Sequence, residues 1–191
     1  MIISLDRQAL MTIHSLHGAL WAVALIAVLA SAYTDLKDRI IPDAFVCLVA
    51  GCGIALGLLS RPGQIHISLL AAIALLFALG ALAHFHVIGG GDVKLISAAT
   101  LLVAPADIGK LLVFIALAGG VLSCAYLLAR RALKGGRGGN DDQDRQGWLS
   151  REGARIASGG PMPYGVAILG GLAGIVAGEI QKCLSAGFCF F

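Results

Sequence analysis

Two aspartates stand beside sequence features that suit acid–base chemistry. Asp35 follows directly on an apolar run, and Asp92 follows three glycines in the motif Gly89-Gly90-Gly91-Asp92-Val93-Lys94. Taken singly, Asp35 could be an ordinary carboxylate at a membrane boundary, and Asp92 could belong to a simple turn. Two carboxylates held close together cannot easily both ionise, so one of them keeps a proton near neutral pH. Such a pair could hydrolyse a peptide bond, because one acid would activate water while the other would bind the carbonyl.

The residues around the two acids have predicted structural roles. The glycines at 89–91 disfavour a helix and allow positive φ angles and close backbone approach, which predicts a tight bend before Asp92. Lys94 is expected to be an orienting or snorkelling charge. Pro42 biases the residue before it away from the helical conformation, and Asp43 is expected to cap the next helix by accepting a backbone N–H.

The elements that must position these acids are membrane helices. Of the 191 residues 58% are hydrophobic and only 13% are charged, and the mean hydropathy is +0.88. A spanning helix needs roughly 20 apolar residues. Apolar runs near this length predict an all-α integral membrane protein, a single domain over residues 1–191, with about six transmembrane helices. The runs are Gly18–Thr34, Ala44–Ser60, Ile67–Ala83, Leu111–Ala129, the glycine-rich Tyr164–Gly178 and the short Leu95–Ala106, which could instead be a re-entrant segment.

The distribution of basic residues predicts how the chain is oriented. With six spans, ten of the 14 Lys and Arg residues fall on one side of the membrane, which the positive-inside bias places in the cytoplasm. Both termini would then lie outside, and Asp35 and Asp92 would meet at the cytoplasmic boundary if the first and fourth spans pack together. The polar stretch of about 130–160 is predicted to be a flexible cytoplasmic loop. The five cysteines and five histidines show no metal-site spacing, so no metal or cofactor is expected.

These motifs resemble those of the type IV prepilin peptidases, members of the GxGD class of aspartic peptidases. The resemblance is carried by Asp35 with Pro42, by Gly89–Leu95, and by Pro163-Tyr164-Gly165 before the last apolar run. It implies that Asp35 and Asp92 are the catalytic pair. Backbone around Gly89–Gly91, together with the segment that contains Pro163, Tyr164 and Gly165, is a candidate for pairing with an extended substrate strand.

The resemblance also implies the reaction and the location. Members of the family cut the basic leader from type IV pilin precursors at the cytoplasmic face of the bacterial inner membrane. The implied partners are a prepilin with a basic leader and an apolar N-terminal helix, the lipid bilayer, and proteins of pilus or secretion assembly, with no nucleic acid. Longer members carry a region with paired C-x-x-C elements associated with N-methylation, which this sequence lacks. The chain therefore resembles the short, peptidase-only branch of the Flp-type, tight-adherence (Tad/Cpa) systems.

Two other classes of function remain open from the sequence. The acids could line an ion path in a small transporter or channel subunit, because ionisable residues in membrane segments are usually functional. The chain could also be an inactive membrane protein of pilus assembly.

Overall fold

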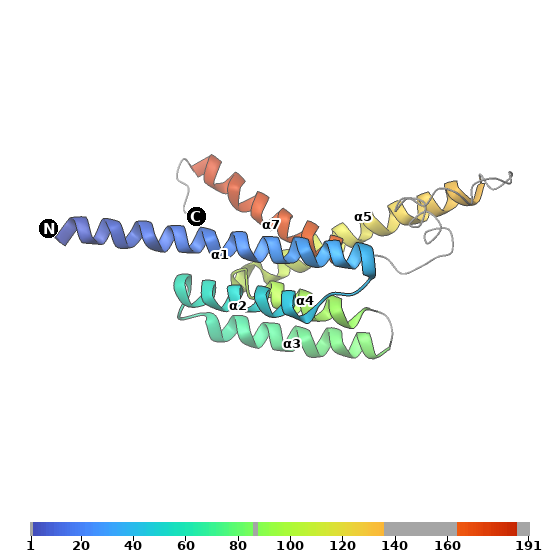
Figure 1. The fold of residues 1–191 in the computed structure, drawn as a ribbon, viewed down its shortest axis with the longest axis horizontal. Coiled ribbons are helices and arrows are strands. Elements are labelled where there is room, and N and C mark those ends of the chain that lie inside the picture. The colour runs from blue at the N-terminus through green and yellow to red at the C-terminus, as the bar shows by residue number, and fades with distance from the viewer. Residues whose placement is uncertain (1, 86–87, 136–163, 187–191) are drawn as a thin grey trace.

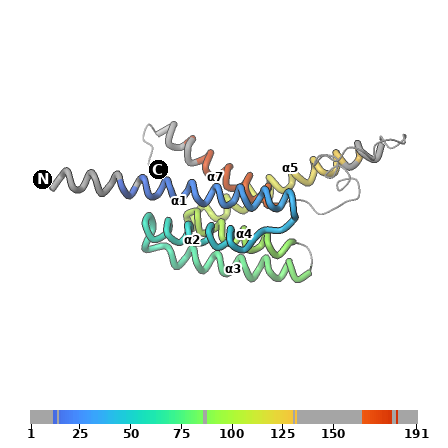
Figure 2. The backbone as a smooth tube through the Cα atoms, in the orientation of Figure 1, coloured from blue at the N-terminus to red at the C-terminus, as the bar shows by residue number. Residues whose placement is uncertain are grey.

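The protein is built from helices. The computed structural model describes residues 2–85, 88–135 and 164–186, and no strand occurs within these ranges. Figures 1 and 2 show the path of the chain. The elements in chain order are α1 (Ile2–Asp38), α2 (Asp43–Ser60), α3 (Ile65–His84), α4 (Gly90–Thr100), the 3₁₀ helix η1 (Pro105–Asp107), α5 (Ile108–Gly135) and α7 (Tyr164–Ala186).

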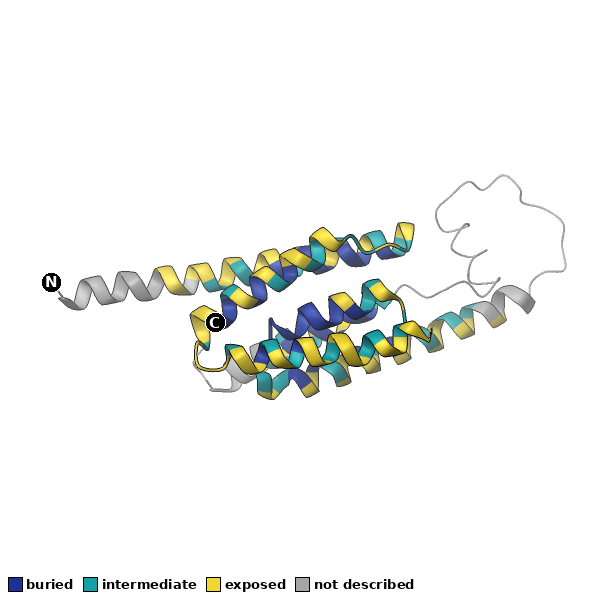
Figure 3. Ribbon diagram, turned by 90° about the horizontal axis from the view of Figure 1, so that it is seen from below, coloured by how far each residue is buried: buried dark blue, intermediate teal, exposed yellow. Residues whose placement is uncertain are grey.

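Four of the described helical stretches are long and apolar enough to cross a membrane. They are Ser15–Asp38, Asp43–Ser60, Ile65–His84 and Pro105–Ala129. α7 adds a shorter apolar stretch, Tyr164–Gly178. The outer faces of the bundle are exposed (Figure 3) and carry large apolar side chains such as Leu70, Phe77 and Val121. An apolar surface of this extent suits contact with lipid rather than with water.

α4 differs from the predicted spans in length. Its 11 residues extend over about 16 Å, roughly half the hydrocarbon thickness of a bilayer, so α4 alone does not cross the membrane. Val93 and all residues from Leu95 to Thr100 are buried, as expected for a helix that is enclosed by others. The run Leu95–Ala106 is therefore an internal half-length helix followed by η1.

The packing of the helices explains how distant residues converge. α1 lies between α7 on one side and α2 on the other (Figure 1), while α4 packs against α2, α3 and α7. The sequence suggested that the two acids meet if their helices pack on each other. Instead, α1 and α4 share two neighbours, α2 and α7, and these hold the end of α1 near the beginning of α4.

α5 and α7 approach each other closely through small residues. A Cβ atom on Gly171 would lie 2.9 Å from the backbone nitrogen of Ile115, and one on Gly174 would lie 3.2 Å from the ring of Phe114. Such glycines let membrane helices come into backbone contact, which strengthens van der Waals packing where lipid provides no hydrophobic drive. This contact fixes α7, and with it the residues at the beginning of α7.

One predicted boundary is wrong and another lies outside the described residues. The first residues of the stretch expected to be a loop from Arg130 are helical, because α5 continues to Gly135. The last residues of α5 before the loop include Arg130, Arg131 and Lys134, and basic side chains favour the C-terminal end of a helix. Residues 136–163, including the rest of the predicted loop and Pro163, are not described by the structure.

Candidate active site

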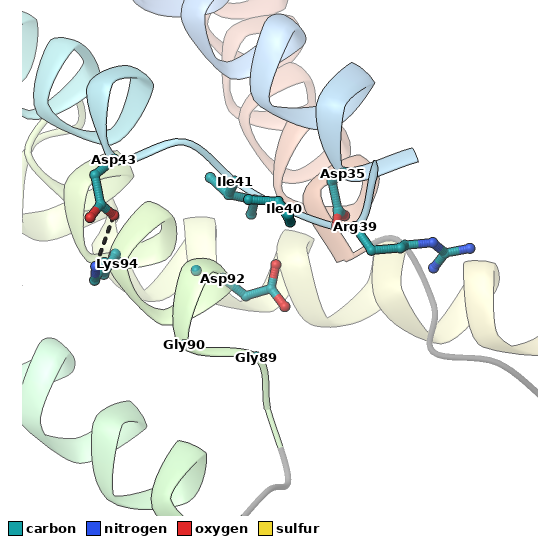
Figure 4. A pocket seen from close by; sticks show the side chains of 10 residues that line it. Asp35, Arg39, Ile40, Ile41, Asp43, Gly89, Gly90, Asp92 and Lys94 are labelled. Atoms are coloured by element: carbon teal, nitrogen blue, oxygen red, sulfur yellow. Dashed lines mark hydrogen bonds and ion pairs between the residues drawn. The ribbon is translucent and has the colours of Figure 1, made fainter. Parts of the chain in front are cut away.

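A cavity of about 300 Å³ opens where α1 ends and where α2 and α4 begin. Both Asp35 and Asp92 line it, although they belong to helices far apart in sequence, and Figure 4 shows their side chains on either side of the same space. Its lining consists of Asp35, Arg39, Ile40, Ile41, Asp43, Gly89, Gly90, Gly91, Asp92 and Lys94. The cavity is therefore formed by the two motifs that the sequence singled out.

Asp35 is held in place by the beginning of α7. Its side chain is in the last turn of α1 and the residue is only 7% exposed. The backbone N–H of Gly165 donates a hydrogen bond of 2.8 Å to Asp35 Oδ2. The N–H groups in the first turn of a helix have no partner within the helix, and the positive end of the helix dipole favours an acidic neighbour. α7 thus supplies a fixed donor that orients the Asp35 carboxyl.

Only a glycine fits at position 165 without adjustment of its neighbours. A Cβ there would lie 3.1 Å from Asp35 Oδ2 and 3.2 Å from the Cα of Ala32. The resemblance suggested Gly165 as a substrate-binding residue, whereas the structure shows its backbone bound to Asp35. The Tyr164 side chain packs against α5. A Cβ added to Gly119 of α5 would lie only 3.0 Å from the Tyr164 hydroxyl.

Asp92 lies in the first turn of α4, facing the same cavity. Burial raises the pKa of its carboxyl to about 6, and the nearby charge of Asp35 contributes to the same shift. An acid with this pKa holds its proton over a large part of the range below neutral pH, unlike an aspartate in water. The charge of Asp35 acts on Asp92 because both carboxyl groups face the same cavity.

The glycines before Asp92 act through close approach and not through an unusual backbone. Gly90 and Gly91 are already helical, and Gly89 precedes α4 with φ of −68°, so the expected positive φ angles do not occur. A Cβ on Gly89 would lie 2.8 Å from Asp92 Oδ2, and one on Gly91 would lie 3.2 Å from the Cβ of Ile41. A Cβ on Gly90 would meet nothing within 4 Å. Two of the three glycines therefore make room for their neighbours.

The connection between α1 and α2 forms the wall of the cavity between the two acids. α1 ends at Asp38, and the next residue, Arg39, has a left-handed φ of 57° and donates its N–H to the carbonyl oxygen of Asp35. A left-handed residue commonly terminates a helix, although it costs energy when the residue is not glycine. The chain then passes Ile40 and Ile41 before α2. The sequence analysis did not select Arg39, Ile40 or Ile41, because each is unremarkable until the turn places it beside the acids.

The predicted capping role of Asp43 is wrong. The residue at the N-cap of α2 is Pro42, and no side chain caps this helix. Asp43 is the first residue of α2, and its Oδ1 lies 2.8 Å from Lys94 Nζ, which forms an ion pair between α2 and α4. Figure 4 shows this pair at the edge of the cavity. A capping rule considers neighbours along the chain only, so it could not find a partner on another helix.

The described part of the chain holds no group of three or more His, Cys, Asp or Glu residues that could bind a metal ion. The charged groups that line the cavity are three acids, Asp35, Asp43 and Asp92, and two cations, Arg39 and Lys94, beside backbone amides.

Comparison with protein families connects this cavity to a known class of protein. A family model described as the type IV leader peptidase family matches residues 22–128, more than half of the chain. The chain belongs to the type IV leader peptidase family. The match includes both Asp35 and Asp92 and ends before α7, which donates the hydrogen bond to Asp35. No match was found among curated proteins, and none was found among solved structures.

Membership in this leader peptidase family identifies the protein as a multi-pass membrane peptidase, and hence a hydrolase. It favours proteolysis over the transport reading that the sequence left open. The resemblance noted from the motifs is confirmed at the level of the family.

Proposed function

We propose that the protein is an aspartic endopeptidase that removes the leader from type IV prepilins, with Asp35 and Asp92 as its catalytic pair. The observation that supports this most directly is that the two acids, on α1 and α4, line a single cavity. A peptidase of this kind needs two carboxyl groups in different protonation states around one water molecule. The hydrogen bond that Asp35 accepts favours its ionised form, whereas burial and the charge of Asp35 favour protonated Asp92, whose pKa is about 6.

In the proposed reaction Asp35 is the base and Asp92 is the acid. A water molecule between them attacks the carbonyl carbon of the scissile bond while Asp35 accepts a proton from that water. Asp92 donates its proton toward the carbonyl oxygen as negative charge develops there. The tetrahedral intermediate then collapses, the C–N bond breaks, and the leaving amine takes a proton from the pair. The reaction needs no covalent intermediate between enzyme and substrate.

The substrate that suits this site is an extended peptide beside an apolar helix. Gly89–Gly91 line the cavity and carry no side chains of their own, which leaves their backbone groups accessible for pairing with a peptide. Pairing between backbone groups would hold the peptide in an extended form. The substrate helix would lie in the bilayer, and the basic leader would remain on the side of the cavity.

The finer aspects of the proposal come from the sequence. The resemblance implies a single-domain protein of the bacterial inner membrane. The distribution of basic residues, counted over six spans, favours both termini outside and the site toward the cytoplasm. The lack of C-x-x-C elements favours the short branch that processes Flp-type pilins in tight-adherence systems, without N-methyltransferase activity. The partners would then include proteins of pilus or secretion assembly.

The test is leader removal from a co-expressed prepilin whose basic leader ends in glycine and precedes an apolar segment. Gel mobility distinguishes precursor from product in cells that produce the wild type, Asp35→Asn or Asp92→Asn. Each substitution preserves size and should abolish processing. Asp38→Asn is the matched control, because Asp38 is one turn beyond Asp35 and exposed. Normal processing by Asp35→Asn or Asp92→Asn would remove that residue from the catalytic pair.

A further inference from the structure

The ion pair between Asp43 and Lys94 connects the two halves of the cavity. Lys94 is two positions after Asp92 on α4, and Asp43 begins α2 directly after the connection that leads from Asp35. Their charged atoms lie 2.8 Å apart, and both residues line the cavity. The pair therefore joins α4, which carries Asp92, to the start of α2, which follows the connection from Asp35.

This bridge lies where the fold has little else to fix the distance between the acids. α1 and α4 are held together through α2 and α7 rather than by extensive packing on each other. Between α1 and α2 the chain from Arg39 to Pro42 is not helical. Ile41 rests against Gly91, and the ion pair is a second contact between the same connection and the first turns of α4. The connection is therefore joined to α4 at two points, one apolar and one ionic.

The exposure of the pair indicates that folding is not its main role. The side chains of Lys94 and Asp43 are 50% and 70% exposed. Exposed ion pairs contribute little to the stability of a fold. They can still set geometry and local charge, and both properties matter beside an acid whose protonation state is used in catalysis.

We propose that Asp43 and Lys94 act as a positioning pair that keeps Asp92 aligned with Asp35 and keeps the charge around Asp92 balanced. This inference rests on the proposed peptidase function, and it gives Lys94, expected from the sequence to be an orienting or snorkelling charge, a specific partner in Asp43. Neither side chain takes part in the reaction itself.

The proposal predicts opposite electrostatic effects for the two single substitutions. The charged groups around Asp92 in the cavity are Asp35 and Arg39 from the end of α1, Asp43 from α2, and Lys94 from α4 itself. Asp43→Asn leaves the positive charge of Lys94 unbalanced, which favours ionised Asp92 and lowers its pKa. Lys94→Gln leaves the negative charge of Asp43 unbalanced, which raises that pKa.

Thermal unfolding in detergent measures these shifts without any enzymatic activity. The pKa of Asp92 is about 6 in the folded protein and 3.8 ordinarily, so the folded state loses stability as the pH rises between these values. Asp92→Asn has no carboxyl group to ionise and avoids this loss. The Tm difference between Asp92→Asn and the wild type should therefore grow as the pH rises through this window and stay constant at higher pH. Asp43→Asn should move the upper end of this window to lower pH, and Lys94→Gln should move it to higher pH, while the lower end is set by the unfolded chain and stays in place.

Prepilin processing measures the positioning effect. Each single substitution should lower kcat by about tenfold, and the reversed pair, Asp43→Lys with Lys94→Asp, should recover activity to within about threefold of wild type. The matched control is the ion pair between Lys110 and Asp107, which has a similar length of 2.6 Å but lies elsewhere in the fold. Lys110→Gln should change neither processing nor the Tm window.

The two readouts separate this inference from the proposed function. Opposite shifts of the Tm window together with recovery in the reversed pair support the positioning pair. Shifts in the same direction, unchanged windows, or a reversed pair no better than the single variants would overturn it. If Asp92→Asn processed prepilin normally, the proposed function would fail, whereas the window shifts would still report on the pair.

Discussion

The hydrogen bond between Gly165 and Asp35 can be tested by adding a single methyl group. In Gly165→Ala the new Cβ would lie 3.1 Å from Asp35 Oδ2, 3.2 Å from Asp35 Cβ and 3.2 Å from the Cα of Ala32. One of these atoms is backbone, so α7 must move away from α1 by a few tenths of an ångström. The hydrogen bond, now 2.8 Å, would lengthen and weaken.

The expected loss follows from the strength of that bond. A hydrogen bond to a charged group contributes about 1.5–3 kcal/mol, and each 1.36 kcal/mol corresponds to about tenfold in rate. Partial loss of the Gly165 contact should therefore lower kcat for prepilin processing by about 10- to 100-fold, with little change in KM, because the methyl group disturbs the orientation of Asp35. Overpacking costs about 1–3 kcal/mol, but alanine gains about 1 kcal/mol over glycine in a helix, so the protein should still fold.

The control is Gly178→Ala, on the same helix, where the added Cβ meets nothing within 4 Å. Its processing should equal that of the wild type, and its stability should be equal or slightly higher. The measurement is single-turnover processing in detergent, with thermal unfolding of each variant alongside. Processing by Gly165→Ala within threefold of wild type, or an equal loss in Gly178→Ala, would refute the reasoning.

Three further outcomes follow from contacts described above. Gly89→Ala should lower processing by more than tenfold, because its Cβ would lie 2.8 Å from Asp92 Oδ2. Gly90→Ala, with open space around its Cβ, should not disturb the acid, and equal losses in single-turnover assays would contradict this. Processing should decline as the pH rises through about 6, because Asp92 then loses the proton that it donates. A rate that instead rises over this range would assign the acid role to another group. Gly53→Ala should lower the stability by about 1–3 kcal/mol in thermal or denaturant unfolding, because its Cβ would lie 2.6 Å from that of Leu101; an unchanged Tm would show that α2 and α4 separate freely.

Local sequence rules predicted the helices well. Pro42 and the Arg61–Gly63 turn delimit α2, and the apolar runs correspond to α2, α3 and α5. The rules failed at ends that depend on tertiary contacts. The half-length α4 ends at Thr100, and just beyond it the carbonyl oxygen of Leu102 accepts a hydrogen bond from Arg61, which lies in the turn between α2 and α3. No pattern within residues 90–106 contains that information.

The candidate site was predictable to the extent that its residues carry a recognisable spacing. Asp35 and Asp92 follow from the motifs, and the cavity contains both. The groups that orient the acids were not predictable, because they act across large separations in sequence. Gly165 reaches Asp35 from 130 positions away, and Lys94 reaches Asp43 from 51 positions away. For Asp43 the local explanation as a helix cap was sufficient, so nothing in the sequence asked for another.

The contact between α7 and Asp35 also determines how much of the chain must be kept together. A fragment cut at residue 128, where the family match stops, would retain both acids and lose the amide that orients one of them. A chain divided between α5 and α7 would instead keep both acids and the Gly165 amide, provided that Gly171 and Gly174 of α7 pack again on α5. Truncation and complementation experiments should therefore treat α7 as part of the catalytic unit and not as a dispensable tail.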